Sequence, residues 1–300
     1  MSVDRAWQLL DAGNIAGARR ELDDALREDP NDSRAHALLA WCLLKQDDRG
    51  GATREAVTAL ELAPDSPYCH YVMTWVWIAR GRYEAAERQL TQLFQLEPDD
   101  VENLRVRAKL RATTHRLDEG RADLEQARSL DPEHPATLAE LGYVLLRLGD
   151  LNQARHCAEG ALANQPNHSD ALLLMGTLEL HEGRAEEAKS LAFAALANSP
   201  DNADALELLV KSKFRQNWFT GLWWRAALRI SRLTSSSRYW LILTFFGLYA
   251  VAILLVKNSR IETVLHALFW SCVLYAYISD ALFETAVERE RKTVRLKRHF

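Results

Sequence analysis

Three tryptophans near the start of the chain recur at a fixed spacing. Trp7, Trp41 and Trp75 are 34 residues apart, and Lys109 and Tyr143 continue the same spacing. Aromatic side chains and arginine contribute most of the binding energy at protein interfaces. The pattern therefore indicates noncovalent binding of an apolar or aromatic peptide, and not the making or breaking of covalent bonds.

The sequence offers no arrangement that is typical of catalysis or of metal binding. His181-Glu182 lacks the second histidine of a zinc-protease helix, and no glycine-rich phosphate loop is present. No serine or cysteine has the glycine-flanked setting of a nucleophile. The four cysteines lack the paired spacing of a metal site and are expected to be buried thiols in a reducing compartment. We expect no enzyme activity, no cofactor and no metal.

The elements that position the tryptophans repeat with the same period. Six prolines stand 34 residues apart: Pro30, Pro64, Pro98, Pro132, Pro166 and Pro200. Proline suits the passage from one helix to the next, because it lacks a backbone donor and biases the preceding residue away from helical angles. Seventeen residues before each proline is a turn position, occupied by Gly13, Asp47, Gly81, His115, Gly149 and Gly183. Twelve before each is a small residue: Ala18, Ala52, Ala86, Gly120, Ala154 and Ala188. A period of this length predicts a stack of helical repeats.

This pattern resembles the tetratricopeptide repeat (TPR), a helix-turn-helix unit with small, large and proline residues at these positions. The resemblance covers roughly residues 3–210 and implies an all-α superhelical solenoid of about six repeats plus a capping helix, over residues 1–215. First helices should start near these residues: Ser33, Pro67, Val101, Pro135, Ser169 and, for the capping helix, Ala203. The second repeat has Asp47 at the glycine turn, and the fourth has Gly120 inside a helix and Arg107 at a usually apolar position. We expect the stack to be most irregular there.

In this family the first helix of each pair lines a concave face, which usually holds a peptide or another protein. The resemblance implies a partner-binding groove with these residues: Trp7, Arg34, Trp41, Tyr68, Tyr71, Trp75, Arg105, Lys109 and Tyr143. The alternative is that the tryptophans only fill space between thin repeats. Family members that clamp a carboxyl terminus use groove asparagines, which are absent here, so binding of that type is not expected.

Charge divides the chain into two parts. Residues 1–210 carry 22 basic and 36 acidic side chains, whereas residues 211–300 carry 15 and 5. Nucleic-acid binding is not expected of the acidic part, because neutralisation of phosphates supplies most of that affinity. The basic part suits the anionic cytoplasmic face of a membrane.

Residues 216–238 combine tryptophans with basic residues, the composition of an amphipathic helix that lies in a membrane interface. The expected membrane-interface residues are those of this segment and one aspartate further along the chain: Trp218, Trp223, Trp224, Arg225, Arg229, Arg232, Arg238 and Asp280. The alternative is a capping helix with core tryptophans packed on the last repeat. Asp280 is interpreted as an anchor paired with Arg238, the alternative being a proton or ion relay.

Residues 239–283 are expected to form a transmembrane hairpin. The run 239–256 contains eighteen residues without a charge, and 263–279 contains seventeen with only His266 ionisable. Each is about long enough to cross a bilayer core of roughly 30 Å. A buried helical pair in a soluble protein is the alternative, but a helix that is apolar on all sides favours lipid. Basic residues flank both outer ends, including the tail 284–300, which predicts cytoplasmic N- and C-termini. The alanine- and arginine-rich composition and the compact hairpin are interpreted as bacterial, which places the hairpin in the inner membrane.

Two functional hypotheses follow from these expectations. In the first, the chain is a membrane-anchored scaffold or adaptor whose groove binds a protein or peptide partner at the cytoplasmic face. In the second, it is a subunit or assembly factor of an integral-membrane complex, and the hairpin is its main binding surface. Partners would be a protein or peptide and membrane lipid in the first case, with other integral-membrane subunits in the second.

Overall fold

The computed structural model describes residues 2–198, 202–216, 266 and 284–290. All secondary structure in these residues is helical, which confirms the predicted all-α class. The chain forms two compact units, Met1–Asn164 and Gln165–Phe300. The first unit contains the predicted groove residues.

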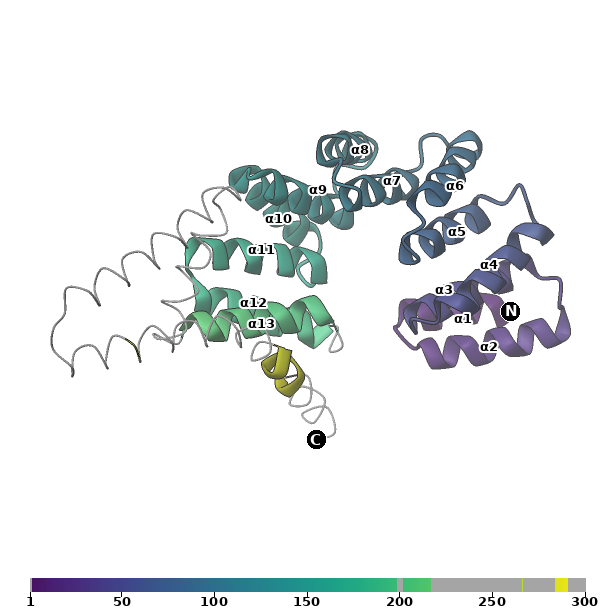
Figure 1. The fold of residues 1–300 in the computed structure, drawn as a ribbon, viewed down its shortest axis with the longest axis horizontal. Coiled ribbons are helices and arrows are strands. Elements are labelled where there is room, and N and C mark those ends of the chain that lie inside the picture. The colour runs from purple at the N-terminus through teal and green to yellow at the C-terminus, as the bar shows by residue number, and fades with distance from the viewer. Residues whose placement is uncertain (1, 199–201, 217–265, 267–283, 291–300) are drawn as a thin grey trace. The chain divides into compact units, whose positions relative to one another are not determined.

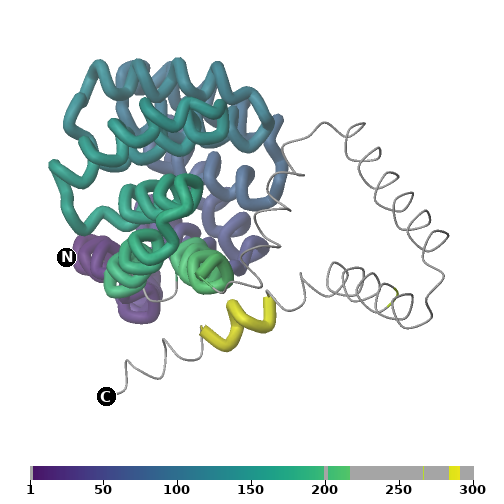
Figure 2. The backbone as a smooth tube through the Cα atoms, turned by 90° about the vertical axis from the view of Figure 1, so that its left-hand side faces the viewer, coloured from purple at the N-terminus to yellow at the C-terminus, as the bar shows by residue number. Residues whose placement is uncertain are grey.

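Five antiparallel helix pairs make up the first unit (Figures 1 and 2). The helices are α1 (Ser2–Asp11), α2 (Ile15–Glu28), α3 (Ser33–Lys45), α4 (Arg49–Leu62), α5 (Pro67–Ala79), α6 (Tyr83–Leu96), α7 (Val101–Thr113), α8 (Leu117–Leu130), α9 (Pro135–Leu148) and α10 (Leu151–Asn164). The first helices α3, α5, α7 and α9 begin at the residues that the proline ladder predicts. The repeat frame read from the sequence is therefore confirmed.

Side-chain caps fix the start of the first helices. The carboxylate of Asp32 accepts hydrogen bonds from the backbone N–H groups of Arg34 and Ala35, at 2.9 and 3.0 Å. Asp100 accepts a 2.8 Å bond from the N–H of Asn103 in the same way. Such caps satisfy donors that a helix start leaves without an intrahelical partner. They set where each first helix begins and thus which residues share its faces.

The turns inside the repeats are more regular than expected. Gly13, Gly81 and Gly149 have positive φ, and so do Asp47 at 61° and His115 at 64°. The turn of the second repeat is therefore regular although it lacks the usual glycine, and so is the turn of the fourth. The reason is the helix-ending hydrogen bond, which each turn makes: the N–H after Asp47 donates to Leu43 at 2.9 Å, and the N–H after His115 donates to Arg111 at 2.8 Å.

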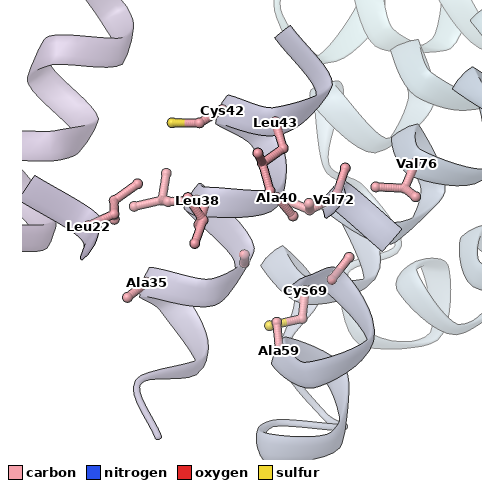
Figure 3. Close-up of a cluster of buried hydrophobic side chains, with 14 of the residues drawn as sticks. Leu22, Ala35, Leu38, Ala40, Cys42, Leu43, Ala59, Cys69, Val72 and Val76 are labelled. Carbon is pink, nitrogen blue, oxygen red and sulfur yellow. The ribbon is translucent and has the colours of Figure 1, made fainter. Parts of the chain in front are cut away.

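Small residues allow the paired helices to approach closely. Ala18, Ala52, Ala86, Gly120 and Ala154 are all buried. At Gly120 a Cβ atom would lie 3.1 Å from the carbonyl oxygen of Ala108, so the glycine suits the close approach of α8 to α7. Leucines such as Leu22 and Leu38 and other apolar side chains fill the space between neighbouring helices (Figure 3).

The second unit contains α11 (Ser169–Glu182), α12 (Ala185–Asn198) and α13 (Ala203–Gln216). The start of α13 agrees with the predicted capping helix. Residues 284–290 are also helical, and Glu290 forms a 2.6 Å ion pair with Lys213 of α13. The described residues on either side of segment 217–283 therefore contact each other.

The predicted membrane elements lie almost entirely outside the described residues. This applies to the interface segment 216–238 beyond Gln216, to its tryptophans and arginines, to Asp280, and to both proposed spans except His266, which is exposed. Among the helices that the structure does describe, none has the length and apolar character needed to cross a bilayer. The hairpin therefore stays a prediction from sequence.

Candidate functional site

Five aromatic side chains from α1, α3 and α5 form one connected set, which we call the aromatic cluster: Trp7, Trp41, Tyr68, Tyr71 and Trp75. The closest ring centroids are those of Trp41 and Trp75, 5.9 Å apart. The rings of Trp7 and Tyr68, and those of Trp41 and Tyr71, are 6.2 Å apart. Tyr71 lies 6.4 Å from Tyr68 and 6.5 Å from Trp75. These separations lie in the range that favours edge-to-face and offset contacts between aromatic rings.

The repeat frame explains why these rings meet. Tyr68, Tyr71 and Trp75 share one face of α5, because positions i, i+3 and i+7 of a helix project to the same side. Trp7 and Trp41 occupy the position of Trp75 in the two preceding repeats. Stacking of the first helices then brings the three repeats' aromatic residues together.

Exposure within the aromatic cluster is graded. Trp7 is 48% exposed, and the other four side chains are half-buried. Burial raises the pKa values of Tyr68 and Tyr71 above the usual value, so both phenols are neutral at pH 7. The surface is thus largely apolar, with hydroxyl groups that can still exchange hydrogen bonds.

Charged side chains border the aromatic cluster. The ammonium of Lys45 lies 5.2 Å from the ring centroid of Trp41, within range for a cation–π contact. Arg34 pairs with Asp4 of α1 at 3.3 Å. The Lys45 and Asp4 contacts were not predicted, since neither residue occupies a groove position of the repeat.

The predicted groove residue Arg105 is held by ion pairs with two glutamates. Its guanidinium donates to both carboxylate oxygens of Glu140 on α9, at 2.8 and 3.1 Å, and pairs with Glu102 of its own helix. Glu140 was missed from the sequence. The only available signal was its position 35 residues after Arg105, one residue more than the repeat.

The remaining predicted groove residues lie on later repeats. Lys109 is exposed on α7, and Tyr143 is half-buried on α9. The structure therefore brings together the aromatic residues of the first three repeats as a contact network, with the charged residues at its border. The two later positions continue the repeat and are not part of the five-ring set.

The described cysteines do not form a reactive site. Cys42, Cys69 and Cys157 are buried free thiols. Burial raises the pKa of the Cys42 thiol to about 11, which disfavours the reactive thiolate at pH 7. Within the residues that the structure describes, no group of three or more His, Cys, Asp or Glu side chains is placed to hold a metal ion.

Comparisons with known families identify the repeats. Two tetratricopeptide-repeat profiles match residues 9–76 and 67–92. A profile of the middle TPR-like domain of cilia and flagella-associated protein 70 matches residues 115–245. A search of curated proteins found no significant match.

Solved structures show the same fold at low sequence identity. A chain of the APC/C hetero-tetramer Cut9-Hcn1 is 18% identical with a TM-score of 0.58, and the match covers 70% of this chain and 42% of that one. PilW, described as a type IV pilus biogenesis factor, is 19% identical with a TM-score of 0.54, covering 69% and 96%. This chain thus spans less than half of the Cut9-Hcn1 chain. The helix pairs, the 34-residue period and the family matches together show that the chain contains tetratricopeptide repeats.

Proposed function

We propose that this chain is a membrane-anchored TPR scaffold that holds a protein or peptide partner on the aromatic cluster at the cytoplasmic face of the inner membrane. The observation that carries this proposal is the connected five-ring surface across three repeats. Tyr68, Tyr71 and Trp75 pack against the core, but this packing does not cover the whole of the five-ring surface. Here Trp7 is 48% exposed and its four neighbours remain partly exposed.

The residue types favour binding of an apolar or aromatic peptide segment. Tryptophan and tyrosine offer large contact areas and lose little conformational entropy, having only two side-chain torsions. The contacts among Trp41, Tyr71 and Trp75 restrict those rings before any partner arrives. Preorganisation of this kind lowers the entropic cost of association.

The membrane part of the proposal rests on sequence and on one contact. In a membrane hairpin over residues 239–283, both ends of the hairpin would lie on the cytoplasmic side of the membrane. The ion pair between Lys213 and Glu290 supports this, because it joins residues that flank the segment 217–283. The basic composition of residues 211–300 favours an anionic cytoplasmic surface.

A double variant, Trp41→Ala/Trp75→Ala, tests the groove in the full-length protein. We expect capture of partners from detergent-solubilised membranes, quantified by mass spectrometry, to fall at least about tenfold, because two interface anchors are removed. Sedimentation with membranes should be unchanged. The matched control is Trp77→Ala, which removes a half-buried indole from the opposite face of the same helix.

Two results would contradict the proposal, and they point to different parts of it. Undiminished capture by the double variant would remove the aromatic cluster as the binding surface and favour the hairpin as the main site in a membrane complex. Recovery of the wild-type protein in the soluble fraction, without detergent, would contradict the membrane anchor.

A further inference from the structure

A second surface of the first unit differs in chemistry from the aromatic cluster. A cleft of about 420 Å³ lies between α6 and α7 and extends to the residue before α8. Three arginines and an apolar floor line it, and we call it the arginine cleft: Arg107, Arg111, Arg116, Leu90, Phe94 and Leu110. Residues 107 and 111 point about 200° away from groove positions 105 and 109, since each residue turns a helix by about 100°. The two arginines therefore lie on the other side of α7 from its groove positions, although Tyr71 and Trp75 pack against the same core cluster as Leu90 and Leu110.

Arginine is unusual at two of these positions, although the first repeat has Arg5 at the position of residue 107, paired with Glu21 at 3.3 Å. One and two repeats earlier, residue 107 corresponds to Met73 and Leu39, and one repeat later to Leu141, all buried. Residue 111 likewise corresponds to Leu43, Trp77 and Leu145, which are apolar. Apolar residues at such sites stabilise a fold as well as a buried ion pair does, or better. Arg111 has no arginine counterpart in the other repeats of the first unit, and stability alone does not explain this second arginine.

One buried carboxylate organises the arginines. Asp123 of α8 is only 3% exposed, and its Oδ1 accepts bonds from Nε and Nη2 of Arg107 at 2.9 and 2.6 Å. Its Oδ2 lies 2.6 Å from Nη1 of Arg111. The guanidinium of Arg107 also lies 4.1 Å from the ring centroid of Phe94, which restricts it further. The positive groups are thus held in place on an apolar floor.

The arginines keep hydrogen-bonding capacity after these contacts. Each guanidinium has five N–H donors, so the three arginines offer more donors than Asp123, Glu119 and Glu87 can accept. Arg116 pairs with Glu87 at the rim, where the side chains are 38% and 47% exposed. Exposed pairs of this kind contribute only about 0–1 kcal/mol, so an incoming anion could replace Glu87 at small cost.

We propose that the arginine cleft binds an anionic group carried on an aromatic or aliphatic body, such as an aryl phosphate or carboxylate. The anion takes donors of Arg116 in place of Glu87 together with donors of Arg111, and the apolar body lies against Phe94, which is half-buried, whereas Leu90 and Leu110 are at most 3% exposed. Arginine suits this role because its planar donors match phosphate and carboxylate oxygens in pairs. The inference is independent of the partner proposed for the aromatic cluster.

The test uses the detergent-solubilised full chain and isothermal titration calorimetry with phenyl phosphate. We expect saturable binding that weakens with salt, little binding of benzylamine or benzyl alcohol, and weaker binding of inorganic phosphate, which lacks the apolar body. Arg116→Gln should weaken phenyl phosphate binding about tenfold through loss of charge-assisted hydrogen bonds. Thr91→Trp should abolish it, because Thr91 lines the cleft and the indole would fill it.

The matched control is Thr113→Trp. Thr113 is also exposed and its hydroxyl also donates to the carbonyl four residues earlier, but it does not line the cleft. Its affinity for phenyl phosphate should equal that of the wild type. The proposal would be overturned if Thr91→Trp or Arg116→Gln bound phenyl phosphate with the affinity of the wild type. It would also be overturned if the wild type bound benzyl alcohol as tightly as phenyl phosphate. Since Arg116 is at the rim, its glutamine variant stays informative if Thr91→Trp fails to fold.

Discussion

The aromatic cluster and the arginine cleft lie in neighbouring repeats and are built on the same frame, yet they carry opposite chemistries. The cluster occupies groove positions of α1, α3 and α5, where the repeat tolerates almost any side chain. The cleft occupies positions 107 and 111 of α7, where the other repeats of the first unit place apolar residues, except for Arg5 at the position of residue 107. The repeat therefore fixes where a side chain points, and the residue at that position decides what the surface can bind.

The two surfaces also differ in their relation to stability. Ring contacts in the aromatic cluster remove apolar surface from water, so they stabilise the fold whether or not a partner binds. In the arginine cleft, the charge on Asp123 must be paired because the carboxylate is almost fully buried. The rings of the aromatic cluster therefore stabilise the fold and are also available for binding, whereas the stability of the arginine cleft depends on each buried charge having a partner of opposite sign.

The largest expected effect is on the free energy of unfolding, when one partner of the buried Arg107–Asp123 pair is removed. Arg107→Met should lower the free energy of unfolding by about 2–3 kcal/mol, less than the roughly 3–5 of a fully buried pair because Arg107 is 28% exposed. The double variant Arg107→Met/Asp123→Gln installs the residues found one repeat earlier, Met73 and Gln89. It should recover most of the loss, since no carboxylate is then left underpaired.

Urea unfolding followed by circular dichroism measures both changes. Glu87→Gln serves as the control at the exposed rim and should change stability by no more than about 0.5 kcal/mol. If the double variant is as unstable as Arg107→Met, the charge on Asp123 is not the cause and the contrast with the aromatic cluster fails.

A second prediction concerns alkaline pH, which of the two surfaces should affect only the aromatic cluster. Burial raises the pKa values of Tyr68 and Tyr71 in the folded chain above the usual value of 10.0. The folded state therefore holds these protons more tightly than the unfolded state. Their contribution to stability is complete below about pH 10 and is lost as the pH rises through the folded pKa values.

The variant Tyr68→Phe/Tyr71→Phe removes both titrating groups. Its urea midpoint should fall less than that of the wild type between pH 9 and 11, by an amount equivalent to about 1 kcal/mol. Arginines stay protonated throughout this range, so Arg116→Gln should leave the slope against pH unchanged. Parallel curves for the wild type and the tyrosine double variant would mean that the rings are more exposed than the structure indicates.

The sequence predicts the frame well because the frame depends on local signals. Proline, turn and small-residue positions locate the starts of α3, α5, α7, α9, α11 and α13. The regular geometry of the turns at Asp47 and His115 was not predicted, because the backbone hydrogen bond that ends a helix imposes a left-handed residue even where glycine is absent. Local composition alone does not reveal that constraint.

The sites were predictable only in part. The spacing of Trp7, Trp41 and Trp75 indicates a shared face, but the contact of Trp7 with Tyr68 depends on how successive repeats pack. In the sequence, the only sign of the arginine cleft was Arg107 at a position that is usually apolar in the repeat. Its partner Asp123 stands on a different helix, sixteen residues after Arg107, and no short motif joins the two. Pairing between helices is a property of the packed repeat.

The smallest expected effect compares the turns beside the two surfaces. Gly81 joins α5 to α6 in the repeat that contains Tyr68, Tyr71 and Trp75, whereas His115 joins α7 to α8 and directly precedes Arg116 of the arginine cleft, and both have positive φ. A residue with a Cβ atom is strained in this conformation, so His115→Gly should raise the free energy of unfolding by about 0.5–1 kcal/mol. His115→Ala keeps the strain and should give no such gain.

Since His115→Gly does not alter the side chains of the cleft, phenyl phosphate should bind to this variant with unchanged affinity. Stabilisation accompanied by weaker binding would instead mean that His115 itself contributes to the anion site, which would extend the arginine cleft into the turn.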